Sequence, residues 1–310
     1  MANATSRGYQ VGILKEVTYG TTPASALALV RTTGAAIKIA AGSVESEETH
    51  LVEVPDIIRV SADGSFEING EYSYAAFHAL MEGLWCSTFS TNVLTVGTTK
   101  TSFTIEDQYT DASLYLPGKG CLVESFSVSL QQGSKLTVKI TGKVGVVPTA
   151  YATSSAGTGS ATAAPTNAIL SPVGSIQLLQ EGGALDLKGV GTTAFTMDFM
   201  RTNIPQPQLG SLSLSGLDPS TFTAKGTIQL YVPTTSGSTL LDKYLGDTAT
   251  SLACTLGGAS AKKDAYLFTN VKFTDGGIAP IGRGQAAIQS LSWQAYYDAT
   301  NTTCKVTRTP

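Results

Sequence analysis

The chain has 310 residues, 32 glycines, a formal net charge of −3 and a charged fraction of 14%, well below the roughly 25% of a typical globular protein. Without a basic stretch to neutralise phosphates, it does not look like a nucleic-acid binder. Its richness in glycine, serine, threonine and β-branched residues is typical of an all-β protein with many turns.

The N-terminal segment is expected to be an arm. Residues 1–34 hold short apolar pieces interrupted by Tyr19, Gly20, Thr21, Thr22 and Pro23, and closely spaced glycine and proline break regular structure. The first ten residues are polar, so we expect no signal peptide. No apolar run approaches the roughly 20 residues that span a bilayer, so no membrane association is expected.

The next segment, residues 35–148, alternates apolar and polar residues as half-buried strands do. The Asp63-Gly64 pair predicts a tight turn between two such strands. The apolar spacing then changes to that of a short helix over Tyr74–Trp85. A hairpin follows, with Gln132-Gly133 as its turn.

The chain then repeats this order. Residues 149–193 contain an Ala/Thr/Ser/Gly-rich linker and connecting strands. Residues 194–310 predict strands, a turn at Lys225-Gly226, a helix closing at Gly246, and further strands. Three pairs of segments match in pattern: Val60–Ile68 with Phe222–Leu230, Val123–Val128 with Phe268–Phe273, and Val138–Ile140 with Leu291–Trp293. We interpret this as a tandem duplication of one β-sandwich unit with a short flanking helix.

The residues that carry chemistry are sparse. The chain has four widely spaced cysteines with no C-x-x-C pair, which predicts free thiols. Of the two histidines, His78 is expected to pack on its helix, and His50 is a weak candidate for a metal site with neighbouring carboxylates. No catalytic or phosphate-binding motif is present. We therefore predict that the chain is not an enzyme and holds no cofactor or metal.

One charged segment stands out. Residues 45–67 hold seven acids and a single base, Arg59. The acids are Glu45, Glu47, Glu48, Glu53, Asp56, Asp63 and Glu67. The segment is either a solvated loop, a contact loop, or an acidic surface past which DNA slides because like charges repel.

These features resemble siphophage tail tube proteins. The resemblance is carried by Glu16–Pro23, by the order of strands and acidic loop, by the Tyr74–Trp85 helix, and by the closing strand at Ile288–Tyr297. It spans nearly the whole chain and rests on overall layout rather than on a signature residue.

The resemblance implies a structural subunit of a phage tail. Such subunits form β-sandwiches whose sheets line a ring-shaped β-barrel, and the rings stack into a hollow tube for DNA. For a duplicated chain it implies a pseudo-hexameric ring of three chains. The Gly42–Asp56 loop would make the contact between rings, through Glu45, Glu47, Glu48, His50, Glu53 and Asp56. Tyr19, Gly20, Thr21 and Pro23 would contact a neighbour through the arm.

The implied partners are other copies of the chain, a tape measure protein, viral DNA held without sequence-specific contacts, and tail terminator and tail-tip proteins. Assembly in the host cytoplasm and location in the virion tail follow from the same resemblance. Two alternatives remain: another all-β virion protein, such as a tail-tip or decoration protein, and a carbohydrate-binding or adhesin module. The second usually exposes aromatic platforms, whereas Trp85 and Trp293 lie in apolar patterns typical of a core.

Overall fold

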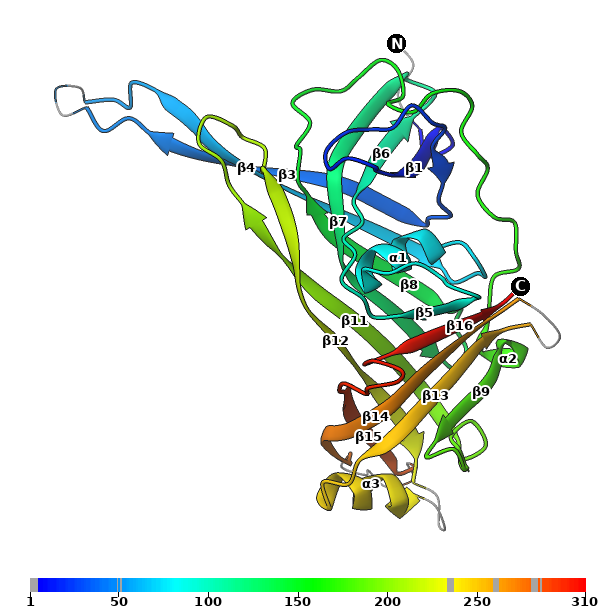
Figure 1. Ribbon diagram of the computed structural model, residues 1–310. Helices are drawn as coiled ribbons and strands as arrows, with labels where there is room; N and C mark the ends of the chain where they lie inside the picture. The colour runs from blue at the N-terminus through cyan, green and yellow to red at the C-terminus, as the bar shows by residue number, and fades with distance from the viewer. Residues whose placement is uncertain are drawn as a thin grey trace.

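The computed structural model describes residues 5–48, 50, 52–232, 237–258, 262–279, 284 and 286–310. It is built mainly of antiparallel strands with short helices, so the predicted all-β class is confirmed (Figure 1). The strands are β1 (Tyr9–Lys15), β2 (Ala28–Leu29), β3 (Gly34–Glu45), β4 (Ile57–Glu71), β5 (Val93–Thr95), β6 (Phe103–Tyr109), β7 (Leu114–Gln131), β8 (Thr137–Val144), β9 (Ile176–Glu181), β10 (Leu185–Asp186), β11 (Thr192–Gln206), β12 (Gly216–Tyr231), β13 (Thr250–Gly257), β14 (Lys263–Ile278), β15 (Ile288–Ala295) and β16 (Lys305–Thr309). The helices are α1 (His78–Trp85), α2 (Pro172–Ser175) and α3 (Gly237–Leu245).

One continuous run of strands, here called the long layer, extends through both halves of the chain. Its order is β3-β4-β8-β7-β11-β12-β15-β14, with every neighbouring pair antiparallel. The β7–β11 pairing joins the two halves. The β3–β4 hairpin projects far from the body, and the β11–β12 hairpin projects on the same side (Figure 1).

Two strands of the long layer change partner along their length. The first part of β7 pairs with β6 and its second part pairs with β8. In the same way, β14 pairs first with β13 and then with β15. Each strand carries a register shift near its change of partner, as bulges that bend a strand do. The apolar core therefore lies between the long layer and the strands and helices that fold back over it.

A single core spans both halves. Trp85, at the end of α1, is fully buried and packs its ring 4.6 Å from Phe199 of β11 and 5.2 Å from Phe222 of β12, measured between centroids. Trp293 is also buried and lies 4.8 Å from Phe268. Both tryptophans are thus core residues, as predicted. The four cysteines are buried and free, which confirms the predicted thiols.

Two of the three predicted Gly-containing turns are wrong. Asp63 and Gly64 lie within β4, and Lys225 and Gly226 lie within β12. Asp63 binds Lys143 of the adjacent strand at 2.8 Å, and a Cβ on Gly64 would meet Val144. A cross-strand ion pair and close packing therefore account for Asp63-Gly64, and close packing against Trp293 accounts for Gly226.

Both predicted helices are present, and each differs from the prediction at one end. The helix expected over Tyr74–Trp85 begins only at His78, because Tyr72 still donates its backbone N–H to Leu136 and Ser73 bridges Ile169. The second helix, α3, ends at Leu245, one residue before the predicted Gly246. Among the described residues, no helix has the length and apolar character needed to cross a bilayer.

Segments assigned to arm and linker contain paired strands. Within residues 1–34, β1 pairs with β6 along its whole length and β2 pairs with β1. Within residues 149–193, β9 pairs with β13 and β10 pairs with β9. The first part of that segment, from about residue 149 to 170, runs along the first half of the chain and contacts it through isolated β-bridges at Ala152, Thr162 and Ile169.

Candidate assembly surfaces

The edge of β3 away from β4 carries no strand in the described structure. Two side chains cap it: the Tyr9 hydroxyl donates to the Ala35 carbonyl at 2.8 Å, and the Ile37 N–H donates to the Asp107 carboxylate at 2.8 Å. Tyr9 also donates to Asp107 at 3.1 Å. We call this pair the Tyr9–Asp107 cap. Burial raises the pKa of both groups, and for Tyr9 the nearby Asp107 charge adds to the effect.

The second free edge is the last part of β14. Within the part of the chain that the structure describes, residues 272–278 pair with β15 and with no other strand. Ala279 donates its N–H to Ile288 of β15 at 2.9 Å. Because alternate residues of a strand direct their backbone groups to opposite sides, Ile278 and Gly276 present theirs at the edge. The Ile278 side chain is 46% exposed.

The tip of the β3–β4 hairpin holds most of the predicted contact residues. Glu45, Glu47, Glu48, His50, Glu53 and Asp56 are all exposed. Ser46 donates its N–H to the Asp56 carbonyl at 2.9 Å and closes the tip. His50 Nε2 lies 3.5 Å from Glu48. The described residues hold no group of three potential ligands, so His50 gains no support as a metal ligand.

The hairpin also exposes an apolar surface that the sequence reading missed. Its members are at least half exposed: Val44, Val52, Val54, Ile57, Ile58 and Val60. Exposed apolar groups gathered at one place mark interaction sites more often than isolated ones do. The sequence does contain a sign of this apolar surface, because the adjacent Ile57 and Ile58 break the apolar–polar alternation expected of a half-buried strand.

The two remaining acids of the charged segment are not part of the tip. Asp63 and Glu67 lie on β4 and pair with Lys143 at 2.8 Å and Lys139 at 3.2 Å on β8. The pKa of Glu67 is lowered, first by the hydrogen bond from Asn69 and then by Lys139. The acidic segment therefore divides into a hairpin tip, where the described acids form no ion pair with a lysine or arginine, and a patch of sheet whose acids are paired with lysines.

The long layer has a polar face opposite the core. Its side chains are mainly small hydroxyls, amides and charged groups. Lys139 and Lys143 form ion pairs on this face, and Asp198 is the cross-strand neighbour of Lys225. The face includes Ser125, Ser127, Ser129, Lys139, Thr141, Lys143, Thr196, Asp198, Thr223, Lys225, Thr227, Ser290, Ser292 and Gln294, none of them fully buried. We call this surface the polar face.

The Glu16–Pro23 segment packs against its own chain. The buried Glu16 carboxylate accepts four hydrogen bonds of 2.7–2.9 Å, which are donated by Gly20 N–H, Ser102 Oγ, Thr104 Oγ1 and Gly120 N–H. The predicted contact residues Tyr19, Gly20, Thr21 and Pro23 follow in this turn. The Tyr19 ring lies 5.2 Å from Lys100 Nζ, and burial raises its pKa to about 12. Contact between these residues and a neighbouring chain stays a prediction.

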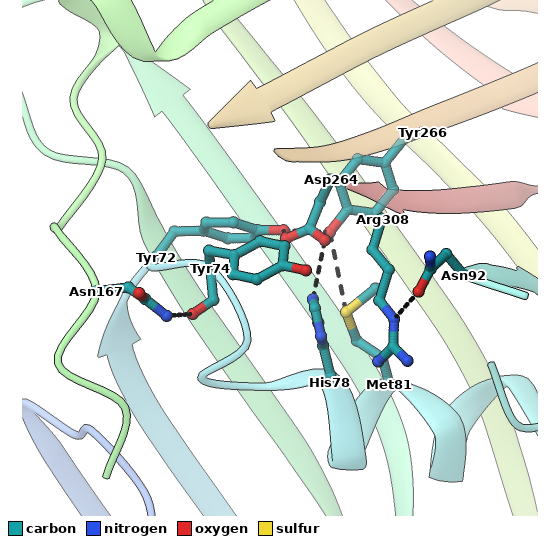
Figure 2. A network of polar contacts seen from close by, with 9 residues as sticks. All are labelled: Tyr72, Tyr74, His78, Met81, Asn92, Asn167, Asp264, Tyr266 and Arg308. Atoms are coloured by element: carbon teal, nitrogen blue, oxygen red, sulfur yellow. Dashed lines mark hydrogen bonds and ion pairs between the residues drawn. The ribbon is translucent and has the colours of Figure 1, made fainter. Parts of the chain in front are cut away.

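A buried polar cluster joins the two halves (Figure 2). Asp264 of β14, only 1% exposed, lies 2.8 Å from His78 Nε2 and accepts a 2.8 Å hydrogen bond from the Tyr72 hydroxyl. Tyr72 is 2.7 Å from the Tyr266 hydroxyl. Burial, reinforced by the Asp264 charge, raises the pKa of Tyr72 well above its ordinary value. His78 is packed in the core, as predicted, and the cluster ties α1 to the second half.

Free strand edges and an exposed apolar hairpin are typical of proteins that associate with other chains. A family model described as phage tail tube protein matches residues 7–295. The chain therefore belongs to the phage tail tube protein family. It is a structural component of the bacteriophage tail and not an enzyme. No match was found among curated proteins.

Proposed function

We propose that three copies of the chain form a ring, and that such rings stack into the hollow tail tube of a siphophage, through which DNA passes into the host. The observation that carries this proposal is a repeated pattern of strand pairing. Each half would supply one tube unit, so that one chain would occupy the positions of two neighbouring subunits in a six-fold ring.

The hairpins repeat in register. Ala40 pairs with Asp63 in β3–β4, and Met200 pairs with Thr223 in β11–β12, each position 160 residues later (40 to 200 and 63 to 223). Ser43 and Arg59 correspond in the same way to Asn203 and Pro219 beyond the register shift. The two hairpins thus share both their strand register and the place of their bulge. This supports descent from one unit, because bulges are specific features of a strand pair.

The partner-changing strands repeat as well. In β6–β7 the register shifts between the pairs Phe103–Cys121 and Ile105–Gly118, and in β13–β14 between Thr250–Val271 and Leu252–Phe268. The shifts in β7–β8 and β14–β15 also correspond. These pairings relate β7 to β14 by 150 residues (121 to 271 and 118 to 268).

The outer strands extend the repeat. The β1–β2 pair beside β6 has its equivalent in the β9–β10 pair beside β13. This supports dividing the chain into units of roughly residues 9–148 and 172–310 with a connecting segment between them. The predicted arm and the connecting strands would then be parts of the units.

Ring closure and stacking would use the surfaces described above. The β3 edge and the β14 edge lie at opposite ends of the long layer, so head-to-tail pairing between copies can continue the sheet until it closes. The polar face would line the lumen, where hydroxyls, and lysines that lie beside carboxylates of neighbouring strands, would offer DNA no strong binding site. The exposed β3–β4 hairpin would contact the adjacent ring.

The remaining partners follow from this role. The tube would enclose a tape measure protein and then DNA, without sequence-specific contacts, and would end at tail terminator and tail-tip proteins. Assembly would take place in the host cytoplasm before the tail joins the virion.

Negative-stain electron microscopy of the purified protein at high concentration, combined with mass measurement, tests the proposal. We expect hollow tubes and rings with the mass of three chains. Rings of six chains would retain the tube and contradict the duplicated subunit. A chain that stays monomeric under all assembly conditions would contradict self-polymerisation.

A further inference from the structure

We propose that the β14 edge of one chain pairs with the β3 edge of the next in the register of the internal β7–β11 junction, and that it replaces the Tyr9–Asp107 cap there. This inference rests on the proposed function. Its partner is a second copy of the same chain, recognised through backbone hydrogen bonds.

The internal junction provides the template. Met197 lies opposite Val128, Asp198 opposite Ser127, and Phe199 opposite Phe126. Under the repeat, β11 corresponds to β3 and β7 corresponds to β14. Transferring the three pairs by 160 and 150 residues places Ile37 opposite Ile278, Lys38 opposite Gly277, and Ile39 opposite Gly276 of the neighbour.

On both edges, the residues that this register would join by hydrogen bonds direct their backbone N–H and C=O groups outward. In the template, Gln132 of the first half donates its N–H to Thr193 at 2.9 Å, so odd-numbered residues of β11 face β7. The corresponding residues of β3 are also odd-numbered, and the capped groups of Ala35 and Ile37 do point outward. On β14, Ile278 is in the outward phase. Ile37 and Ile278 can therefore exchange two hydrogen bonds.

The cap is found where the strand is missing. The pairings β1–β6 and β9–β13 relate Asp107 to Cys254 and Tyr9 to Ile176, because Tyr109, the partner of Tyr9, corresponds to Leu256. Cys254 is a buried free thiol and Ile176 has no hydroxyl, so these two positions of the second half carry neither capping group. In the second half β11 already has β7 as its partner. In the first half, Tyr9 and Asp107 satisfy the two backbone groups that a strand would otherwise satisfy, since buried unpaired groups are costly.

The side chains agree with the pairing. Ile278 is 46% exposed, whereas its counterpart Val128 is fully buried beside Met197. Pairing would bury Ile278 against Ile37 in the same manner. On the opposite face, Lys38 would lie diagonal to Asp275, and opposite charges at that spacing attract each other.

Engineered disulfides test the register. Lys38→Cys combined with Gly277→Cys joins a non-hydrogen-bonded pair, whose Cα atoms approach to about 4.5 Å. A Cβ at Gly277 meets nothing within 4 Å, and the native thiols are buried. The matched positive control is Ser127→Cys with Asp198→Cys, the equivalent pair inside one chain. Ala40→Cys with Ala279→Cys is the off-register control, displaced by about 13 Å along the strand.

We expect mild oxidation of assembled K38C/G277C tubes to link neighbouring chains into covalent oligomers, with intrachain bonds only in the positive control and no bonds in the off-register control. Tubes that form without links, or that link only off register, overturn the inference and leave the tube function standing. If the unmodified chain forms neither rings nor tubes, the proposed function fails and this inference fails with it.

Tyr9→Phe tests the cap. The variant keeps the ring and removes the hydroxyl that holds Ala35, so displacement of the cap should be easier. We expect the lag before assembly to shorten about fivefold, the equivalent of one ordinary hydrogen bond. Tyr151→Phe, at a side chain that is 54% exposed, is the control and should not change the lag. An unchanged or longer lag for Tyr9→Phe, in a variant that melts like the parent, overturns the exchange of cap for strand.

Discussion

Phe66 and Gly142 are cross-strand partners on β4 and β8, and the Phe66 ring fills the space above Gly142 where a Cβ would stand, 2.5 Å away. On β12 and β15 the arrangement is reversed, with Gly226 opposite Trp293 and a Cβ there 2.7 Å from the indole. Each half thus seats one large ring over one glycine. The ring stands on β4 in one pair and on β15 in the other, and in both pairs the glycine leaves the space that the ring fills.

Gly142→Ala and Gly226→Ala should therefore destabilise the fold. The new methyl group would also meet backbone oxygens, Leu122 in one case and Thr196 in the other, so side-chain movement cannot relieve the clash. We expect a loss of about 2 kcal/mol or more in the free energy of unfolding by chemical denaturation. Gly277→Ala is the matched control, because its Cβ enters open space. Equal stability of all three variants would contradict the packing argument.

Glu16→Gln should loosen the turn that precedes Pro23. The carboxylate accepts four hydrogen bonds, and an amide would set its own N–H groups against two of those donors. A loss of about 2 kcal/mol in unfolding free energy is expected. Glu45→Gln, at an exposed glutamate, is the control. A turn without structural importance would leave both variants as stable as the parent.

Removal of the Asp264 carboxylate should weaken the attachment of α1 to the second half. Asp264→Ala leaves His78 and Tyr72 buried without their shared acceptor, and breaking such a buried cluster costs about 3 kcal/mol. Asp247→Ala serves as the comparison, because its ion pair with Lys272 lies on the surface. Denaturation curves followed by tryptophan fluorescence can report both, since Trp85 lies on α1. Similar curves for the two variants would argue against a structural role for the cluster.

The raised pKa of Asp107 predicts a pH dependence of stability. The folded chain holds this proton more tightly than the unfolded chain, so the stabilisation is complete below the ordinary pKa of 3.8 and is lost as the pH rises through the folded pKa. Asp107→Asn cannot ionise. The unfolding free energy of the parent minus that of the variant should therefore fall as the pH is raised from about 4 to neutrality. A difference that rises with pH would contradict the direction of the shift.

A charge on the hairpin should affect stacking alone. Ile58 is 53% exposed in the free chain, so Ile58→Asp should leave folding unchanged and shorten or abolish tubes while rings persist. Electron microscopy and mass measurement distinguish the two products. The control is Leu245→Asp, at a 73% exposed residue ending α3. Tubes of normal length from the hairpin variant would remove this hairpin from the stacking contact.

The sequence predicted features that depend on local pattern. Alternation located the long strands, helical spacing located α1 and α3, and Gln132-Gly133 marked the observed turn between β7 and β8. The sequence pattern and the strand pairing align the two halves differently. The sequence pattern matched Gly226 with Gly64, whereas strand pairing relates Gly226 to Phe66, two residues further on. Alternating sequences look alike after any shift of two, so only pairing partners can fix the alignment.

The features that the sequence could not predict depend on contacts between distant segments. Nothing near Asp107 in the sequence indicates that it caps Ile37, 70 residues away. Likewise, an N-terminal segment with short apolar pieces gives no sign that β1 pairs along all of β6. The acidic segment was recognised by composition, but its division between hairpin tip and sheet depended on lysines supplied by β8.

The two hairpins share a register but differ in charge, and this difference bears on how rings can be superposed. The tip at residues 46–56 carries four acids, whereas the equivalent residues 206–216 carry none. Around a ring of three chains, acidic and uncharged tips would alternate. Such a ring would superpose on itself after rotation by a third of a turn rather than by a sixth. The tube would therefore have two distinguishable kinds of position around its axis, whereas a ring of six identical subunits has one.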